Sequence, residues 1–186
     1  MKLILYHGTS KENALKIQKE GFKINQKTNW DISSKEGFIY LTECYGPFFA
    51  MNCDNKGHGL ALIKVEVDCD DCYPEDDFLM MALKKYPYTK QQLNKVNFED
   101  YKYLWKKSIE HLGNVAVKPD KIKILGITFF ESKKLLYLFD PIISPINFKI
   151  MGNYYKEFSD WIFQGKNPIE FRRFNDIQLP NNINMV

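Results

Sequence analysis

The sequence contains almost no arginine. Only two of its 26 basic residues are arginines, Arg172 and Arg173, and both lie near the C-terminus. Arginine is the side chain best suited to bidentate capture of phosphate and carboxylate groups, whereas lysine acts as a compact point charge. This scarcity excludes chemistry that relies on several arginines to hold substrate phosphates.

Long apolar runs and a strong charge of either sign are also missing. The apolar stretch from Met1 to Leu5 is too short for the hydrophobic region of a secretion signal, and no run is long enough to span a bilayer. The net charge of +3 is too weak to indicate a nucleic-acid partner. We therefore expect a cytoplasmic protein without a membrane partner, whose four cysteines stay reduced.

The rest of the composition is typical of a globular domain. The chain has 186 residues, of which 45% are hydrophobic and 15% aromatic. A chain of this length buries roughly two thirds of the surface that its unfolded form exposes, and this hydrophobic share excludes intrinsic disorder. We expect one domain, made of a core over residues 1–140 and a helical extension, packed on that core, over residues 141–186.

Hydrophobic periodicity predicts interleaved strands and helices, and hence an α+β fold. The predicted strands are 3–7, 37–42, 60–67, 115–117, 122–130 and 135–139. The predicted helices are a segment capped by Ser10 that ends at Gly21, then 48–53, 78–85, 101–112 and 148–163. The polar segments 22–36 and 68–77 are predicted to be a loop and an acidic turn, and Trp30 in that loop is expected to line a pocket.

One motif lies where a ligand can approach the backbone. Tyr6-His7-Gly8-Thr9 ends the first predicted strand and precedes the first predicted helix. Backbone N–H groups are unpaired at such a place, and glycine lets a ligand come close to the main chain. A histidine in this position can hydrogen-bond a ligand hydroxyl or amide; a capping or packing role is the alternative.

Three segments together resemble the ADP-ribosyltransferase superfamily, which includes the poly(ADP-ribose) polymerases and the RNA 2′-phosphotransferases. They are Leu5-Tyr-His-Gly-Thr-Ser10 with Gly21-Phe22, Gly37-Phe-Ile-Tyr-Leu-Thr42 with Phe49-Ala50, and, more loosely, the stretch 108–130. The resemblance implies a split antiparallel β-sheet core with flanking helices, and NAD as the substrate.

The resemblance also implies roles for individual residues. By position, His7 would bind the ribose hydroxyls of NAD and Gly8 would hold the nicotinamide carboxamide through its backbone. Tyr40 would stack on the nicotinamide ring. The other expected NAD contacts come from the same motifs and from the loop that would cover the pocket: Thr9, Trp30, Thr42 and Asn114.

The sequence departs from the family pattern at the catalytic carboxylate. Family members carry a glutamate at the start of a late strand, and Val115 stands in that place here. A carboxylate near the ribose stabilises the oxocarbenium-like transition state that forms as the nicotinamide bond breaks. The run Glu75-Asp76-Asp77 resembles a segment of bacterial and phage relatives of the superfamily, so Asp76 and Asp77 are the expected substitutes. The alternative is that these acids only start a helix.

Cys69-Asp-Asp-Cys72 is the competing motif, because it could join Cys44, Cys53 or His58 in a tetrahedral zinc site. The spacing between Cys44 and Cys53 is poor for such a site. Moreover, Cys72 stands where an apolar residue is expected, and a free cysteine behaves as a small hydrophobic side chain. We expect no metal.

Two functions are consistent with these residues. The first is an NAD-dependent mono-ADP-ribosyltransferase, a glycosyltransferase that cleaves the nicotinamide–ribose bond and passes ADP-ribose to a protein, nucleic-acid or small-molecule acceptor. In it, His7 and Tyr40 position NAD while Asp76 or Asp77 assists. The second is a catalytically inactive module that binds NAD, a related nucleotide or a protein on the same fold. The scarcity of arginine disfavours the RNA 2′-phosphotransferase branch.

Overall fold

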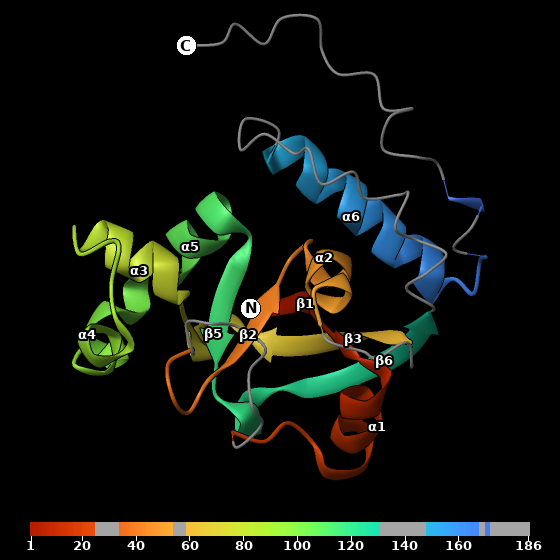
Figure 1. Ribbon diagram of the computed structural model, residues 1–186, viewed down its shortest axis with the longest axis horizontal. Coiled ribbons are helices and arrows are strands. Elements are labelled where there is room, and N and C mark those ends of the chain that lie inside the picture. Colours follow the sequence, from red (N-terminus) through yellow and green to blue (C-terminus); the bar gives the residue numbers. More distant parts are fainter. Residues whose placement is uncertain (25–33, 54–58, 131–147, 168–169, 172–186) are drawn as a thin grey trace, which may run out of the picture.

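The computed structural model describes residues 1–24, 34–53, 59–130, 148–167 and 170–171. In these ranges the chain has the α+β fold that the sequence predicts, with one six-stranded antiparallel sheet and helices on both of its faces (Figure 1). The predicted strand 135–139 and the loop residue Trp30 lie outside the described residues.

The sheet has the strand order β4-β5-β2-β1-β3-β6, so the first strand lies near its centre. The strands are β1 (Lys2–Ser10), β2 (Ile39–Thr42), β3 (Leu60–Asp68), β4 (Cys72–Pro74), β5 (Asn114–Val117) and β6 (Lys123–Phe130). β1 pairs with β3 along its whole length, whereas it shares a single register pair with β2, between Tyr6 and Thr42. The sheet is therefore two three-stranded groups that meet at one short contact.

Helices cover the two faces unequally (Figure 1). The described helices are α1 (Lys11–Glu20), α2 (Gly46–Met51), α3 (Asp76–Ala82), α4 (Lys90–Asn94), α5 (Trp105–Leu112) and α6 (Phe148–Phe163), with the 3-10 helices η1 (Cys69–Asp71), η2 (Phe98–Leu104) and η3 (Pro119–Lys121). α1 packs on one face, α2 and α6 pack on the other, and α3 to α5 gather beside β4 and β5.

The ends of the first helix follow from its sequence. Ser10 caps α1, because its side chain accepts a hydrogen bond from the Asn13 backbone N–H at 3.2 Å. Gly21 ends α1 with a φ of 73°, a backbone conformation that glycine adopts without strain. Both ends lie where the sequence predicts them.

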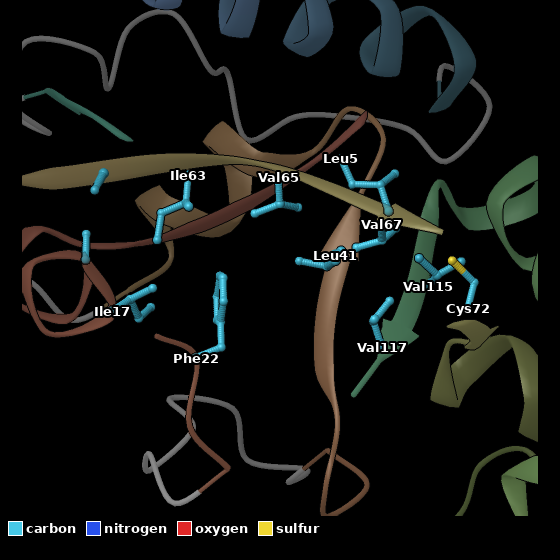
Figure 2. Close-up of a cluster of buried hydrophobic side chains, with 12 residues drawn as sticks. Leu5, Ile17, Phe22, Leu41, Ile63, Val65, Val67, Cys72, Val115 and Val117 are labelled. Carbon is cyan, nitrogen blue, oxygen red and sulfur yellow. The ribbon is translucent and has the colours of Figure 1, made fainter. Parts of the chain in front are cut away.

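Apolar side chains from five strands fill the face that α1 covers (Figure 2). Leu5, Ile63 and Val115 come from three different strands of this cluster, and each is almost completely buried. Burial of such a side chain contributes about 1.5–3 kcal/mol. This cluster ties the two groups of strands together across their short contact.

The opposite face of the sheet is covered in part by α6, the last described helix of the chain. Tyr154 and Phe158 of α6 pack with Tyr6 of β1 and Leu62 of β3 in a second cluster. In addition, the Tyr6 hydroxyl donates a hydrogen bond to Asp160 at 3.1 Å. The described part of the C-terminal segment therefore packs directly on the sheet.

The short edge strand β4 is the main correction to the predicted elements. The acidic run 68–77 was expected to be a turn, but it contains η1, then β4, and then the start of α3. β4 forms because Cys72 and Tyr73 are buried against β5, which is far away in the sequence. Pro74 is tolerated because β4 is an edge strand.

A close approach of two backbones joins β1 to α2. A Cβ atom on Gly8 would lie 1.9 Å from the Gly46 carbonyl oxygen and 2.5 Å from the Ala50 nitrogen. A Cβ atom on Gly46 would lie 2.4 Å from a methyl group of Leu62. At Gly8 the Cβ would meet rigid backbone, so only glycine fits there, whereas at Gly46 it would displace the Leu62 side chain. The two glycines allow α2 to lie directly on the centre of the sheet.

We expect Gly8→Ala to destabilise the fold by about 3 kcal/mol or more, because the new methyl group meets rigid backbone and forces α2 away. The melting temperature should fall by about 2–4 °C for each kcal/mol lost. Gly126→Ala is the matched control, since its Cβ would make ordinary contacts with Phe163 at 3.5 Å and beyond. Equal melting temperatures for the two variants would contradict this account of the β1–α2 contact.

Candidate functional site

His7 lies on β1 where β1 and β2 separate. Its Nδ1 atom is 3.1 Å from the backbone oxygen of Tyr40. Because a carbonyl oxygen only accepts hydrogen bonds, Nδ1 carries the proton and the neutral ring offers Nε2 as an acceptor. Burial lowers the pKa of His7, against the opposing effect of this hydrogen bond, so the ring is uncharged at neutral pH. His7 thus presents one acceptor in a fixed orientation.

The surroundings of His7 are apolar in the described part of the chain. The ring meets Phe22 edge-to-face, with 5.3 Å between the ring centroids. Phe22 belongs to the same cluster as Leu5 and Leu41. No charged group contributes to the shift in the pKa of His7. Among the described residues, therefore, no carboxylate acts on this imidazole.

Gly8 and Thr9, which follow His7 on β1, are both buried. The contact of Gly8 with α2 already requires a glycine at this position, so the glycine of the motif does not by itself indicate a ligand. Thr9 is 4% exposed and lies opposite Ala61 of β3. A ligand that contacts Gly8 and Thr9 would have to bind to their backbone N–H or C=O groups.

Thr42 and Asn114 are register partners on β2 and β5. The Thr42 hydroxyl donates to the Gly113 backbone oxygen at 3.0 Å and accepts from the Tyr45 N–H at 3.0 Å, which fixes the turn from β2 into α2. The Oδ1 atom of Asn114 is buried, and no described residue donates a hydrogen bond to it. Thr42 thus has a structural role, whereas Asn114 keeps one unused acceptor.

Tyr40 forms a compact group with Asp76 and Lys35. Its hydroxyl donates a short hydrogen bond to the Asp76 carboxylate, and the Lys35 backbone N–H donates to that carboxylate and to the Tyr40 hydroxyl, both at 3.1 Å. Asp76 is 5% exposed, and burial raises its pKa to about 6 although the hydrogen bonds from Tyr40 and Lys35 oppose the shift. Burial and the charge of Asp76 raise the pKa of Tyr40. The Tyr40 hydroxyl therefore already donates one hydrogen bond and accepts another within the protein.

Glu75 and Asp77 belong to the start of α3. The Glu75 side chain accepts from the Phe78 N–H at 3.1 Å, and the Asp77 carboxylate accepts from the Tyr88 hydroxyl at 2.8 Å. Burial, with the nearby charge of Asp77, raises the pKa of Glu75 to about 8. The run of three acids therefore does start a helix, which was the plain alternative to a catalytic role.

The rings of His7 and Tyr40 lie on opposite faces of the sheet. Tyr40 lies two residues from Thr42, which is opposite Tyr6, so Tyr40 shares the face of Tyr6. The neighbouring residue His7 points the other way, toward Phe22. The structure therefore brings the His7 ring to the backbone of Tyr40, while the Tyr40 ring and Asp76 lie on the far side of β2.

Val115, where the resemblance would place a glutamate, is completely buried in the cluster that contains Leu5. It lies opposite Leu41 on β2. A carboxylate in this apolar position would be costly to ionise. The described surroundings of Val115 therefore fit the apolar residue that the sequence has there.

Lys35 and Tyr88 were missed by the sequence analysis. Lys35 contributes its backbone N–H to Tyr40 and Asp76, and its ammonium group donates to three carbonyl oxygens at the end of α4, those of Leu93, Asn94 and Val96. These contacts depend on tertiary structure and leave no spacing pattern in the sequence. The sequence offered no signal from which to find them.

Zinc has little support among the described cysteines. Asp68, Cys69 and Asp70 place one possible ligand atom each within 4.8 Å of one another, but no described group joins Cys69 to Cys44 or Cys53. Asp68 already lies 3.4 Å from the N-terminal ammonium group. His58 lies outside the described residues. Cys72 is completely buried, as expected for a small hydrophobic side chain.

We expect Glu75→Gln to make the protein more stable than the wild type at pH 8, with the advantage disappearing toward pH 5. Because the pKa of Glu75 is about 8 in the folded protein and near 4.5 when unfolded, folding binds a proton between these values. The contribution of protonated Glu75 to the free energy of unfolding of the wild type is therefore lost as the pH rises from about 4.5 to about 8. We expect a difference of about 4 kcal/mol at pH 8.

Urea unfolding of both proteins at pH 5, 6.5 and 8 measures this difference. Glutamine keeps an oxygen that accepts from the Phe78 N–H, so the helix cap is preserved. Glu110→Gln is the control, because Glu110 is exposed on α5. A difference between Glu75→Gln and wild type that does not change with pH would show that Glu75 ionises normally.

Comparisons with known proteins return no relative. None of the described helices is both long enough and apolar enough to cross a membrane. No protein-family model, no curated protein and no solved structure matches this chain.

Proposed function

We propose that this chain binds NAD beside His7, where β1 and β2 separate, on a fold like that of the ADP-ribosyltransferases. The observation that carries the proposal is the fixed imidazole of His7: its Nδ1 atom is engaged by the Tyr40 backbone oxygen, so Nε2 would be the acceptor for a ribose hydroxyl. Its orientation comes from the Tyr40 carbonyl and not from a ligand, so the site is formed in advance.

The arrangement of the strands supports the same proposal. The three segments that resemble the superfamily are far apart in the sequence, yet they contribute the neighbouring strands β5, β2 and β1; the third segment also contributes β6, at the other edge of the sheet. β1 and β2 separate after one register pair, as a split sheet requires. The backbone of Gly8 and Thr9 would then contact the nicotinamide carboxamide beside His7.

Binding without cleavage is the function that the geometry favours over ADP-ribosyl transfer. Loss of nicotinamide leaves positive charge on the ribose, and a carboxylate beside it stabilises that charge. Val115 supplies none, and Asp76 and Asp77 are held on the far side of β2 by Tyr40 and Tyr88. A transferase that uses Asp76 or Asp77 would have to bring that acid to His7 by breaking these hydrogen bonds.

We expect NAD at about 100 times its dissociation constant to raise the melting temperature by roughly 5–10 °C. His7→Ala should weaken NAD binding about three- to tenfold, because one hydrogen bond to the ligand is lost. The matched control is His111→Ala, since His111 is an exposed histidine at the end of α5. Calorimetric titration with NAD would measure these affinities. Unchanged affinity in His7→Ala would overturn the proposed site.

A second experiment separates binding from transfer. We expect incubation with NAD to release no nicotinamide above the uncatalysed background, although NAD binds. Release that is abolished by Asp77→Asn or Asp76→Asn would instead identify a transferase with a substituted acid. In that case the acids must leave their positions at the start of α3, and the binding-only function would be wrong.

A further inference from the structure

A hollow lies at the edge of the protein beside β2 and β5, away from the His7 ring. Three segments line it: the stretch before β2, the connection between α4 and η2, and the residue that follows β5. The lining residues are Lys35, Phe38, Asn94, Lys95, Val96, Asn97, Phe98, Glu99 and Lys118. Its volume is about 410 Å³, within the range of sites that hold small molecules.

The floor of the hollow is aromatic and apolar. The rings of Phe38 and Phe98 lie 5.1 Å apart with 33° between their planes. Phe98 is 2% exposed and Val96 is 7% exposed, while Phe38 is only half-buried. Phe38 also packs edge-to-face on Tyr73, with 4.9 Å between the ring centroids, so its position is fixed from behind. The Lys35 ammonium group lies over the Phe98 ring, 5.5 Å from its centroid, so a planar ring entering the hollow would pack on the exposed part of Phe38.

The charges around the hollow are mostly positive. Lys118 pairs with Glu99 at 2.9 Å, which is the one carboxylate in the lining. The ammonium group of Lys35 donates to three carbonyl oxygens, so its position is fixed. Lys95 is exposed and forms no ion pair with any described residue. Three lysines against one carboxylate favour an anionic ligand.

We propose that this hollow binds a small aromatic anion of the mononucleotide class. The base would pack on Phe38 over the aromatic floor, and the phosphate would lie between Lys95 and Lys118. Lysine binds phosphate as a point charge, so the two exposed lysines can serve without arginine. This site is separate from the one proposed for NAD, because it lies beyond the Tyr40 side of β2 and contains no residue near the His7 ring.

The test is calorimetric titration of the full chain with UMP, which lacks both the adenine and the nicotinamide of NAD. We expect saturable binding that weakens with added salt. Exchange of both lysines in Lys95→Gln/Lys118→Gln should weaken it about tenfold or more. The matched control is Lys107→Gln, since Lys107 is an exposed lysine on α5 outside the hollow, and it should change the affinity less than about twofold.

Three further measurements decide between the outcomes. Uridine and inorganic phosphate, titrated separately, should each bind more weakly than UMP, because each uses only half of the site. His7→Ala should leave UMP binding unchanged, which separates this proposal from the NAD site. Melting temperatures confirm that the variants fold. Absent UMP binding, equal affinity in the double variant, or phosphate binding as tight as UMP would each overturn the proposal.

Discussion

The contact between Gly8 and Gly46 is the constraint on which the central part of the fold depends. Because neither residue has a side chain, α2 lies directly on the middle of β1. This close approach puts Tyr45 and Ala50 beside Tyr6, in the cluster to which α6 then adds its aromatic side chains. The packing of α2, and of α6 beyond it, on the sheet thus depends on the close approach of the β1 and α2 backbones at these two glycines.

Tyr40 connects the two faces of the sheet. Its carbonyl oxygen orients the His7 ring on one face, and its hydroxyl holds the carboxylate of Asp76 on the other. The residue is therefore central to the candidate site, but through its backbone and not as a free aromatic wall. An acid tied to this hydroxyl is removed from the face where a nicotinamide–ribose bond would lie.

Much of the fold could be predicted because the relevant signals are local. Ser10 and Gly21 mark the ends of α1 by their side-chain and backbone preferences, and alternation or continuous apolar runs mark β1 and β3. β4 could not be predicted in this way, because it exists through pairing with a distant strand. The same limit applies to the site. The sequence identified His7 as a candidate, but which face each side chain occupies depends on the strand register, and the contacts of Lys35 depend on how the elements pack.

The order of the strands has a consequence for how the chain is assembled during synthesis. The strand that completes the outer edge of β2 is β5, and β3, β4 and the helices α2 to α5 are made between the two. β1 likewise pairs with β3, which follows it in the chain, and β3 pairs with the later strand β6. Such long-range pairings are slow because distant segments must be brought together before any hydrogen bond forms. The nascent chain therefore carries exposed strand edges for much of its elongation, and the sheet is completed only when its C-terminal half has emerged.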